Sequence, residues 1–216
     1  LHTLLAAPLR SRRRARAGDL DAGRALCGMH LVSRDTHALS AIEIAGATIE
    51  SVAENLSDGV VAPWLAFALG GAPGAAAYRA VNTLDSRWGY RNEQFEALGG
   101  AAARLDDAVN LVPSRLTALG IVAAAASDGD ADGGEALACW RADAGVTASP
   151  NAGHPMAAMA GALRVRLVKR EAYVLGARYR DPAVEDIGRA IQIARRAATL
   201  VGAGVLGALV ATGGMR

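Results

Sequence analysis

The chain has few aromatic residues, little cysteine, almost no lysine and no large excess of either charge. Its 21 acidic residues nearly balance its 23 basic ones, of which Lys169 alone is not arginine. A net charge of +2 argues against a dedicated nucleic-acid-binding protein, which normally carries a large basic excess. Cys27 and Cys139 are too few and too far apart for a disulfide framework or a zinc ribbon, and they favour a reducing compartment.

Small side chains are abundant instead. The 216 residues include 50 alanines and 25 glycines, about a third of the chain, and 52% of the residues are hydrophobic. That hydrophobic fraction excludes a disordered chain, and small residues allow helix backbones to approach closely, as they do in membrane bundles. The length suits one domain with a sizeable core or two small ones.

Two long runs, residues 59–78 and 197–215, contain no charged residue. Each is close to the length that crosses about 30 Å of hydrocarbon as a helix. The first run carries Gly70, Gly71 and Gly74 together with Pro63 and Pro73, which predict a kinked, re-entrant or protein-buried segment. The second run is the better transmembrane candidate, and the alternative is a buried core helix of a soluble all-α protein.

The first 19 residues include a run of arginines at residues 10–16. Because no aromatic residues interleave with them, a cytoplasmic juxtamembrane segment explains the run better than a nucleic-acid patch. We expect one membrane domain across residues 1–216, with this basic segment at 1–19, a motif-bearing region at 20–180 and a C-terminal helix, expected to be transmembrane, at 187–215. The chain begins at Leu1 rather than at methionine, so we expect a fragment.

The sequence predicts an all-α fold, a polytopic helical membrane protein with kinked or broken helices and polar loops. Helices are expected at residues 20–57, with Asp35 or Thr36 as a cap, and at 101–126, with a kink or boundary at Pro113. A turn is expected at 58–59, and a short helix with a polar loop at 78–91. Further helices are expected at 156–167 and 187–209, a loop at 127–135 and irregular structure at 173–182. No segment shows the sustained alternation of a strand.

The segment at residues 202–207 matches a dinucleotide-binding GxGxxG pattern letter for letter. A nucleotide site also needs a preceding strand and an acidic residue about 20 positions later, and too few residues follow. We therefore interpret these glycines as small residues on a packed helix. The aspartates at residues 128–132 imitate the start of a calcium loop, but Cys139 stands where the bidentate glutamate belongs, so a solvated loop is expected.

One predicted helix carries a stripe of carboxylates. Glu43, Glu50 and Glu54 fall within about 40° of one another on a helix, and Asp58 extends the stripe. Their neighbours are strongly apolar, and carboxylates beside lipid must face water, arginine or a metal. A solvated face is the plainer alternative to a functional site.

A second cluster lies at residues 104–115. Asn110 can meet Asp106 or Asp107, and Arg104 and Arg115 are near on the same helix. Carboxylate and amide oxygens suit Mg²⁺, which often bridges to a phosphate that arginines clamp. A surface salt-bridge network is the alternative. Short polar motifs at Asn82 to Asp85 and at Ser149 to Asn151 lie in expected loops, where binding groups tend to gather.

Read together, these polar segments resemble the CobD/CbiB family of adenosylcobinamide-phosphate synthases. The similarity runs in unbroken order from about residue 20 to residue 180, which is far more specific than any single motif. Family members usually carry further membrane helices ahead of this region. The matching segments are residues 33–36, 47–63, 70–74, 78–86, 89–90, 103–107 with Asn110, 113–118, 149–153 and 157–163.

The resemblance implies a multi-pass enzyme of the bacterial inner membrane that acts in cobalamin biosynthesis. Such proteins join a carboxylate of adenosylcobyric acid to aminopropanol or its phosphate, using ATP and Mg²⁺, and give adenosylcobinamide or its phosphate. Membrane lipid and other corrin-pathway membrane enzymes are the expected partners, and no nucleic acid is expected.

From residue type and spacing we expect the following roles. Catalytic carboxylates are expected at Glu50, Glu54 and Asp58, of which Glu54 or Asp58 would take the proton of the amine. Metal binding is assigned to Asp106 and Asp107, with Glu50 and Glu54 as the alternative pair, and Arg34, Arg104 and Arg115 are expected to contact phosphate. The remaining substrate-binding candidates are Asp35, Asn55, Asn82, Asp85, Asn110, Ser149 and Asn151.

Two other classes of function stay open. A non-enzymatic membrane scaffold or regulatory protein of related architecture would not need this set of polar motifs in one apolar chain. A soluble all-α binding protein is the third alternative, and solubility without detergent would distinguish it.

Overall fold

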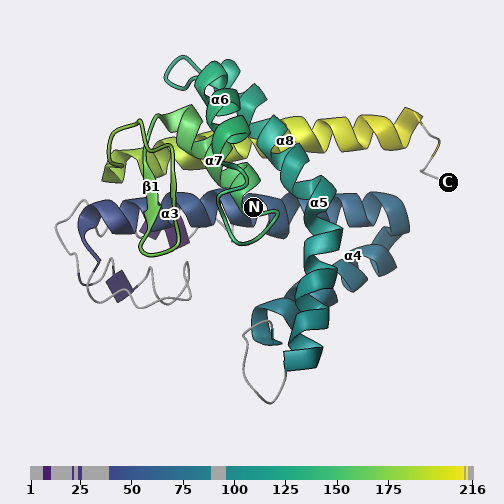
Figure 1. Cartoon of the computed structure of the whole chain (residues 1–216). Coiled ribbons are helices and arrows are strands. Elements are labelled where there is room, and N and C mark those ends of the chain that lie inside the picture. Colours follow the sequence, from purple (N-terminus) through teal and green to yellow (C-terminus); the bar gives the residue numbers. More distant parts are fainter. Residues whose placement is uncertain are drawn as a thin grey trace.

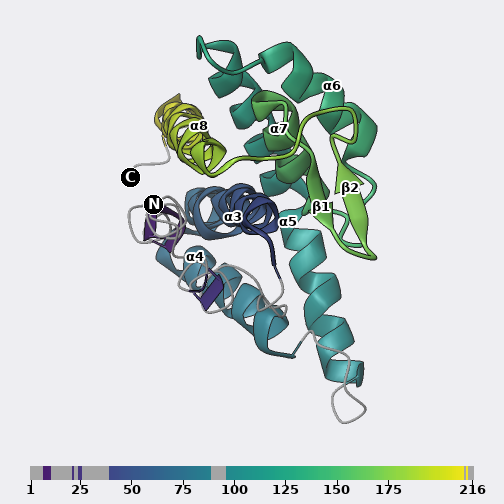
Figure 2. The same cartoon turned by 90° about the vertical axis from the view of Figure 1, so that its left-hand side faces the viewer.

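The computed structural model describes residues 7–10, 21, 24, 25, 39–88, 96–211 and 213. Long helices dominate it, and two of them, α3 and α8, run side by side in the same direction (Figures 1 and 2). Helix α5 crosses this pair steeply, with α4 packed along its first part and α6 and α7 at its other end. The elements are α3 (Ala41–Leu56), η1 (Ser57–Val61), α4 (Ala62–Trp88), α5 (Glu96–Ala126), α6 (Gly133–Asp143), α7 (Gly153–Leu163), β1 (Leu167–Lys169), β2 (Tyr173–Leu175) and α8 (Val184–Ala211).

Helix α3 starts with a capping box. The Ser40 hydroxyl accepts a hydrogen bond from the Glu43 backbone N–H, and the Glu43 carboxylate accepts one from the Ser40 N–H. These bonds satisfy backbone donors that a helix end leaves open. Because Ser40 caps the helix, residues 39 and 40 are not helical, and the expected continuous helix over 20–57 is wrong at these two residues. The expected caps Asp35 and Thr36 lie outside the described residues.

The expected turn at residues 58–59 is also wrong, because the chain stays helical there. Residues Ser57–Val61 form the π-helical segment η1, which joins α3 to α4 without a break. The helix breaks later, at Gly71, whose φ of 61° and ψ of −153° suit a glycine, which has no Cβ. The predicted kink in this run is thus confirmed, and the helix expected at 78–91 is the second part of α4, which folds back along α5 (Figure 1).

Helix α5 continues through Pro113 as one element, so no helix boundary lies at that residue. Neighbouring helices pack along both of its parts, and such packing allows a proline inside a long membrane helix. The segment that matched GxGxxG lies inside α8, so the helix interpreted there is confirmed. The expected packing is wrong at Gly204 and Gly207, which are exposed and where a Cβ would have no neighbour within 4 Å among the described residues. The aspartates at 128–132 lie in the loop between α5 and α6, as interpreted from the sequence.

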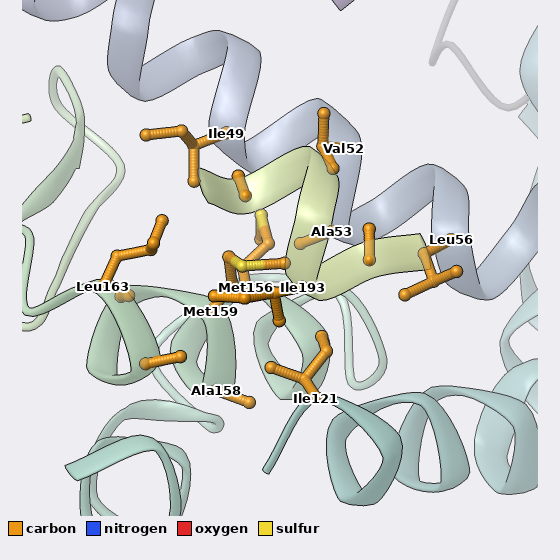
Figure 3. Close-up of a cluster of buried hydrophobic side chains, with 14 of the residues drawn as sticks. Ile49, Val52, Ala53, Leu56, Ile121, Met156, Ala158, Met159, Leu163 and Ile193 are labelled. Atoms are coloured by element: carbon orange, nitrogen blue, oxygen red, sulfur yellow. The ribbon is translucent and has the colours of Figure 1, made fainter. Parts of the chain in front are cut away.

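The core gathers around α7. Every residue of α7 except His154 is buried, and Met156, Met159 and Leu163 meet side chains from three other helices. Figure 3 shows the side chains that surround them, namely Ile49, Val52 and Leu56 of α3, Ile121 of α5 and Ile193 of α8. This packing holds α3, α5 and α8 in fixed relative positions, and α3 and α5 carry several residues of the candidate site.

A short antiparallel hairpin follows α7. Strands β1 and β2 pair Leu167 with Leu175 and Lys169 with Tyr173. The expectation that no strand exists, and that 173–182 is wholly irregular, is therefore wrong. Strands of three residues are too short to give the alternating pattern that identifies strands in a sequence.

Three stretches of the described chain are long and apolar enough to cross a membrane: residues 41–86, 99–126 and 184–211. Large apolar side chains are exposed on all three, among them Phe67, Leu69, Val112 and Leu206. The protein is therefore an all-α membrane protein with a kinked helix, as predicted. The C-terminal apolar run lies in α8 as far as Ala211.

Candidate functional site

Carboxylates from four helical segments lie within electrostatic range of one another around Asp58. Asp58 of η1 lies within electrostatic range of Glu54 of α3, Asp85 of α4 and Asp106 of α5. We call these four residues the acidic cluster. Glu54 is exposed, whereas the other three are partly buried. Because like charges repel at short range, such a grouping favours a cation or a proton at the site.

Amide side chains hold the α5 part of the cluster. Asp106 accepts hydrogen bonds from Asn82 Nδ2 at 3.3 Å and from Asn110 Nδ2 at 3.0 Å. Arg79 donates to Asn82 Oδ1 at 3.2 Å, so a cation lies one residue away from the carboxylate. Asn110 is almost fully buried, with 1% of its surface exposed. The Asp106 carboxylate is therefore fixed in orientation by neighbours from α4 and α5.

A second group of hydrogen bonds surrounds Asn151, at the start of α7. Its Nδ2 donates to the Asp107 carbonyl at 2.8 Å and lies 3.4 Å from Asp107 Oδ1, while its Oδ1 accepts from Ser114 and Arg115. Ser149 also donates to Asp107, at 3.4 Å. We call Asp107, Ser114, Arg115, Ser149 and Asn151 the amide hub. It joins the loop before α7 to the middle of α5.

The loop that carries Ser149 and Asn151 is held by a neutral histidine. Trp140 Nε1 donates to His154 Nδ1 at 2.8 Å, which requires that this nitrogen carry no proton. Burial, together with the nearby Arg115 guanidinium, lowers the pKa of His154. The imidazole is therefore neutral at physiological pH and keeps its bond to α6.

The structure thus brings together most of the residues predicted from the sequence. Asp58 lies within electrostatic range of Glu54, Asp85 and Asp106, and Asn82 and Asn110 bind Asp106. Asp107, Arg115, Ser149 and Asn151 share the hub. Asp106 and Asp107 contact different partners because neighbouring residues on a helix point about 100° apart.

Other predicted residues lie apart from these two groups. Glu50 is buried in α3, Asn55 donates to the Ser51 carbonyl of its own helix, and Arg104 is exposed on α5. Glu43, counted with the carboxylate stripe, instead caps α3 and pairs with Arg170. Arg34 and Asp35 lie outside the described residues.

Four residues in or next to these groups were not assigned a role from the sequence. The Tyr78 hydroxyl donates a hydrogen bond to Asn110 Oδ1, and Ser114 donates one to Asn151. Arg79 donates a hydrogen bond to Asn82, and Lys169 lies in electrostatic range of Glu54. Tyr78 and Ser114 lie within the motifs quoted above, and a polar residue inside an apolar helix is the signal that identifies them.

The donors of the acidic cluster suit Mg²⁺ chemically. Carboxylate and amide oxygens are hard ligands, and Mg²⁺ is usually held by one or two carboxylates, waters and substrate phosphates. Among the described residues, no group of three or more histidine, cysteine or acidic side chains is arranged to hold a metal by itself. Asp58, Asp85 and Asp106 would therefore hold Mg²⁺ only together with oxygens from a substrate or from water.

Comparison with known proteins gives a consistent result. The family model for the CobD/Cbib protein matches residues 2–201. The cobalamin biosynthesis protein CobD of Rhodobacter capsulatus is 45% identical over 189 residues, which cover 84% of this chain and 58% of that protein. The protein of the same name from Chromobacterium violaceum is 44% identical over 209 residues, or 91% of this chain and 63% of that protein.

The chain therefore spans about three fifths of the length of these curated relatives. A shorter match, to the cobalamin biosynthesis protein CobD of Stutzerimonas stutzeri, reaches 50% identity over 137 residues, which are 63% of this chain and 43% of that protein. No solved structure matches the chain.

Proposed function

Because the chain belongs to the CobD/Cbib protein family, we propose that it takes part in cobalamin biosynthesis and catalyses the formation of an amide bond. The reaction would join a carboxylate of adenosylcobyric acid to the amine of aminopropanol or of its phosphate, with ATP. The product would be adenosylcobinamide or its phosphate, made at the bacterial inner membrane by a multi-pass protein. The observation that carries this proposal is the acidic cluster beside the amide hub.

The chemistry explains why such a site needs these residues. An amide does not form spontaneously from a carboxylate and an amine in water, so ATP would first convert the carboxylate into an acyl phosphate or a similar mixed anhydride. Mg²⁺ bound near Asp58, Asp85 and Asp106 would supply positive charge beside the phosphates. Arg115, held by the Leu111 carbonyl at 2.7 Å and by Asn151, has the fixed geometry that suits a phosphate contact.

The attacking amine must be neutral and must lose a proton when the amide forms. A carboxylate within hydrogen-bond reach of the amine would accept that proton. Glu54 suits this role because it is the exposed member of the cluster, whereas Asp106 is held by two amides. Asn82, Asn110 and Asn151 would orient the substrate or the carboxylates around it.

The test measures product formation with matched variants. Asp106→Asn keeps the shape of the side chain and removes its charge, so we expect at least a 100-fold loss of cobinamide formation from adenosylcobyric acid, aminopropanol or its phosphate, and ATP. The control is Asp130→Asn, whose carboxylate lies in the exposed loop between α5 and α6. Equal turnover by the Asp106→Asn variant and the unaltered protein would refute the assignment.

A growth experiment with the same variant distinguishes an enzyme from a scaffold. We would express the 216-residue chain, and a version extended to the length of its relatives, in a strain that lacks this synthase. Growth on cobyric acid that depends on Asp106 supports catalysis. Growth that survives Asp106→Asn would refute the role of Asp106, whereas failure of both versions to restore growth would favour a scaffold for other corrin-pathway membrane enzymes.

A further inference from the structure

Tyr78 lies where an apolar groove meets the acidic cluster. The groove has a volume of about 1190 Å³ and runs between α4, α5 and α8. Its lining residues are apolar or glycine, with Tyr78 as the single polar one among them. The side chain is 6% exposed, and its hydroxyl lies 3.0 Å from Asn110 Oδ1 and 3.2 Å from the Asp58 carbonyl oxygen. The ring therefore borders hydrocarbon-like surface while the hydroxyl lies in the site.

The chemistry of the partners fixes the direction of these hydrogen bonds. An ionised carboxylate only accepts, so the amide nitrogen of Asn110 must face Asp106. The carbonyl oxygen of Asn110 then faces Tyr78, and the Asp58 carbonyl is also an acceptor. Tyr78 is consequently the donor, and its single hydroxyl hydrogen is shared between these two acceptors. A chain of polar contacts therefore runs from the π-helical segment through Tyr78 and Asn110 to Asp106.

We propose that Tyr78 is a positioning residue of the site, which holds η1 against α5 and orients Asp106 through Asn110. The expected effect on kcat rests on the proposed function. The expected effect on the positions of η1 and Asp106 rests on the hydrogen bonds alone. The bonds of the amide hub run between other residues. Loss of the Tyr78 hydroxyl should therefore disturb the acidic cluster and leave substrate contacts at the hub in place.

The first variant is Tyr78→Phe, which removes one oxygen atom and keeps the ring in the groove. We expect kcat to fall by about 100-fold, as small misplacements in active sites do, and KM to change by less than about twofold. The matched control is Tyr179→Phe. The Tyr179 hydroxyl also has two partners, Glu135 and Arg178, but neither belongs to the acidic cluster or to the amide hub, so kcat should stay unchanged.

A second variant tests whether Tyr78 acts through Asn110. Asn110→Asp still accepts from Tyr78 but has no amide N–H to donate to Asp106. We expect the same fall in kcat, and no further fall when Tyr78→Phe is added to it, because both changes interrupt one chain of bonds. If the double variant lost kcat by the product of the two single losses, or if Tyr78→Phe kept a normal kcat, the proposal would be overturned.

A structural readout distinguishes failure of this inference from failure of the proposed function. Amide hydrogen exchange of the chain in lipid nanodiscs should become faster in residues 57–61 of Tyr78→Phe, with no change in α7. If the unaltered protein makes no cobinamide but this exchange still rises, the proposed function fails and the positioning role stands. Unchanged exchange in residues 57–61 would refute the positioning role whatever the activity.

Discussion

The two halves of α8 are both rich in alanine and glycine, but they lie in opposite environments. Residues 184–198 include nine buried residues and belong to what we call the packed lobe, together with α3, α6, α7 and the hairpin. Residues 199–211 include no buried residue and, with the first part of α4, form what we call the apolar arm. Alanine and glycine make up a third or more of each half of α8, so the content of small residues alone does not separate the two regions.

Charge and close contact separate them. The packed lobe is edged by ion pairs such as Arg180 with Asp186 and Arg178 with Glu135. The arm has no charged residue in its α8 part and exposes Leu200, Leu206 and Val210. Small residues therefore serve close packing against protein in the lobe, and in the arm they leave an uncharged surface suited to hydrocarbon.

The largest effect is expected from enlarging a glycine in the lobe. A Cβ on Gly161 would lie 2.3 Å from the Glu135 carbonyl oxygen and 2.7 Å from Cys139 Cβ, so α7 and α6 would have to separate. We expect Gly161→Val to cost more than about 3 kcal/mol of folding free energy. A Cβ on Gly204 in the arm would have no neighbour within 4 Å among the described residues, so Gly204→Val should cost less than about 1 kcal/mol.

The reactivity of the Cys139 thiol provides a measurement of how tightly the lobe is packed in the two variants. Burial raises the pKa of this thiol to about 12, so the reactive thiolate is scarce while the lobe is folded. In a Cys27→Ser background, maleimide should label Cys139 much faster in Gly161→Val than in Gly204→Val. Equal labelling rates would mean that the lobe is not packed more tightly than the arm.

The next largest effect concerns membrane insertion of the arm. Leu206→Lys places a charge on the exposed apolar part of α8 and should cost about 3 kcal/mol of apparent insertion free energy, measured as the inserted fraction in microsomes. Val174→Lys is the control, because Val174 is also an exposed apolar residue but lies on the hairpin of the lobe. If both variants insert equally well, the arm does not lie in hydrocarbon.

The smallest effect is a pH dependence confined to the lobe. The Tyr179 hydroxyl, with Arg178, holds the pKa of Glu135 below its ordinary value of 4.5. A depressed folded-state pKa gives a contribution to stability that is present above pH 4.5 and is lost as pH falls through the folded value. The Tm should therefore decrease slightly more between about pH 6 and about pH 3 in the unaltered protein than in Glu135→Gln. Identical pH profiles would contradict this.

The sequence by itself determined the helical membrane class, the kink in the first apolar run and the family. These follow from local properties, because an uncharged run of 20 residues, a glycine near a proline and an ordered set of motifs need no knowledge of distant contacts. The short strands and the π-helical segment escaped prediction because neither leaves a periodic pattern of sufficient length.

Only the tertiary structure decided how the candidate residues are grouped. Asp58, Asp85 and Asp106 meet because the chain reverses at Gly71 and brings the end of α4 beside α5. The same packing gives Tyr78 two acceptors and places Asn151 next to Asp107, 44 positions earlier in the chain. Spacing along a helix predicts which side chains share a face, but which faces meet depends on the packing of the whole core.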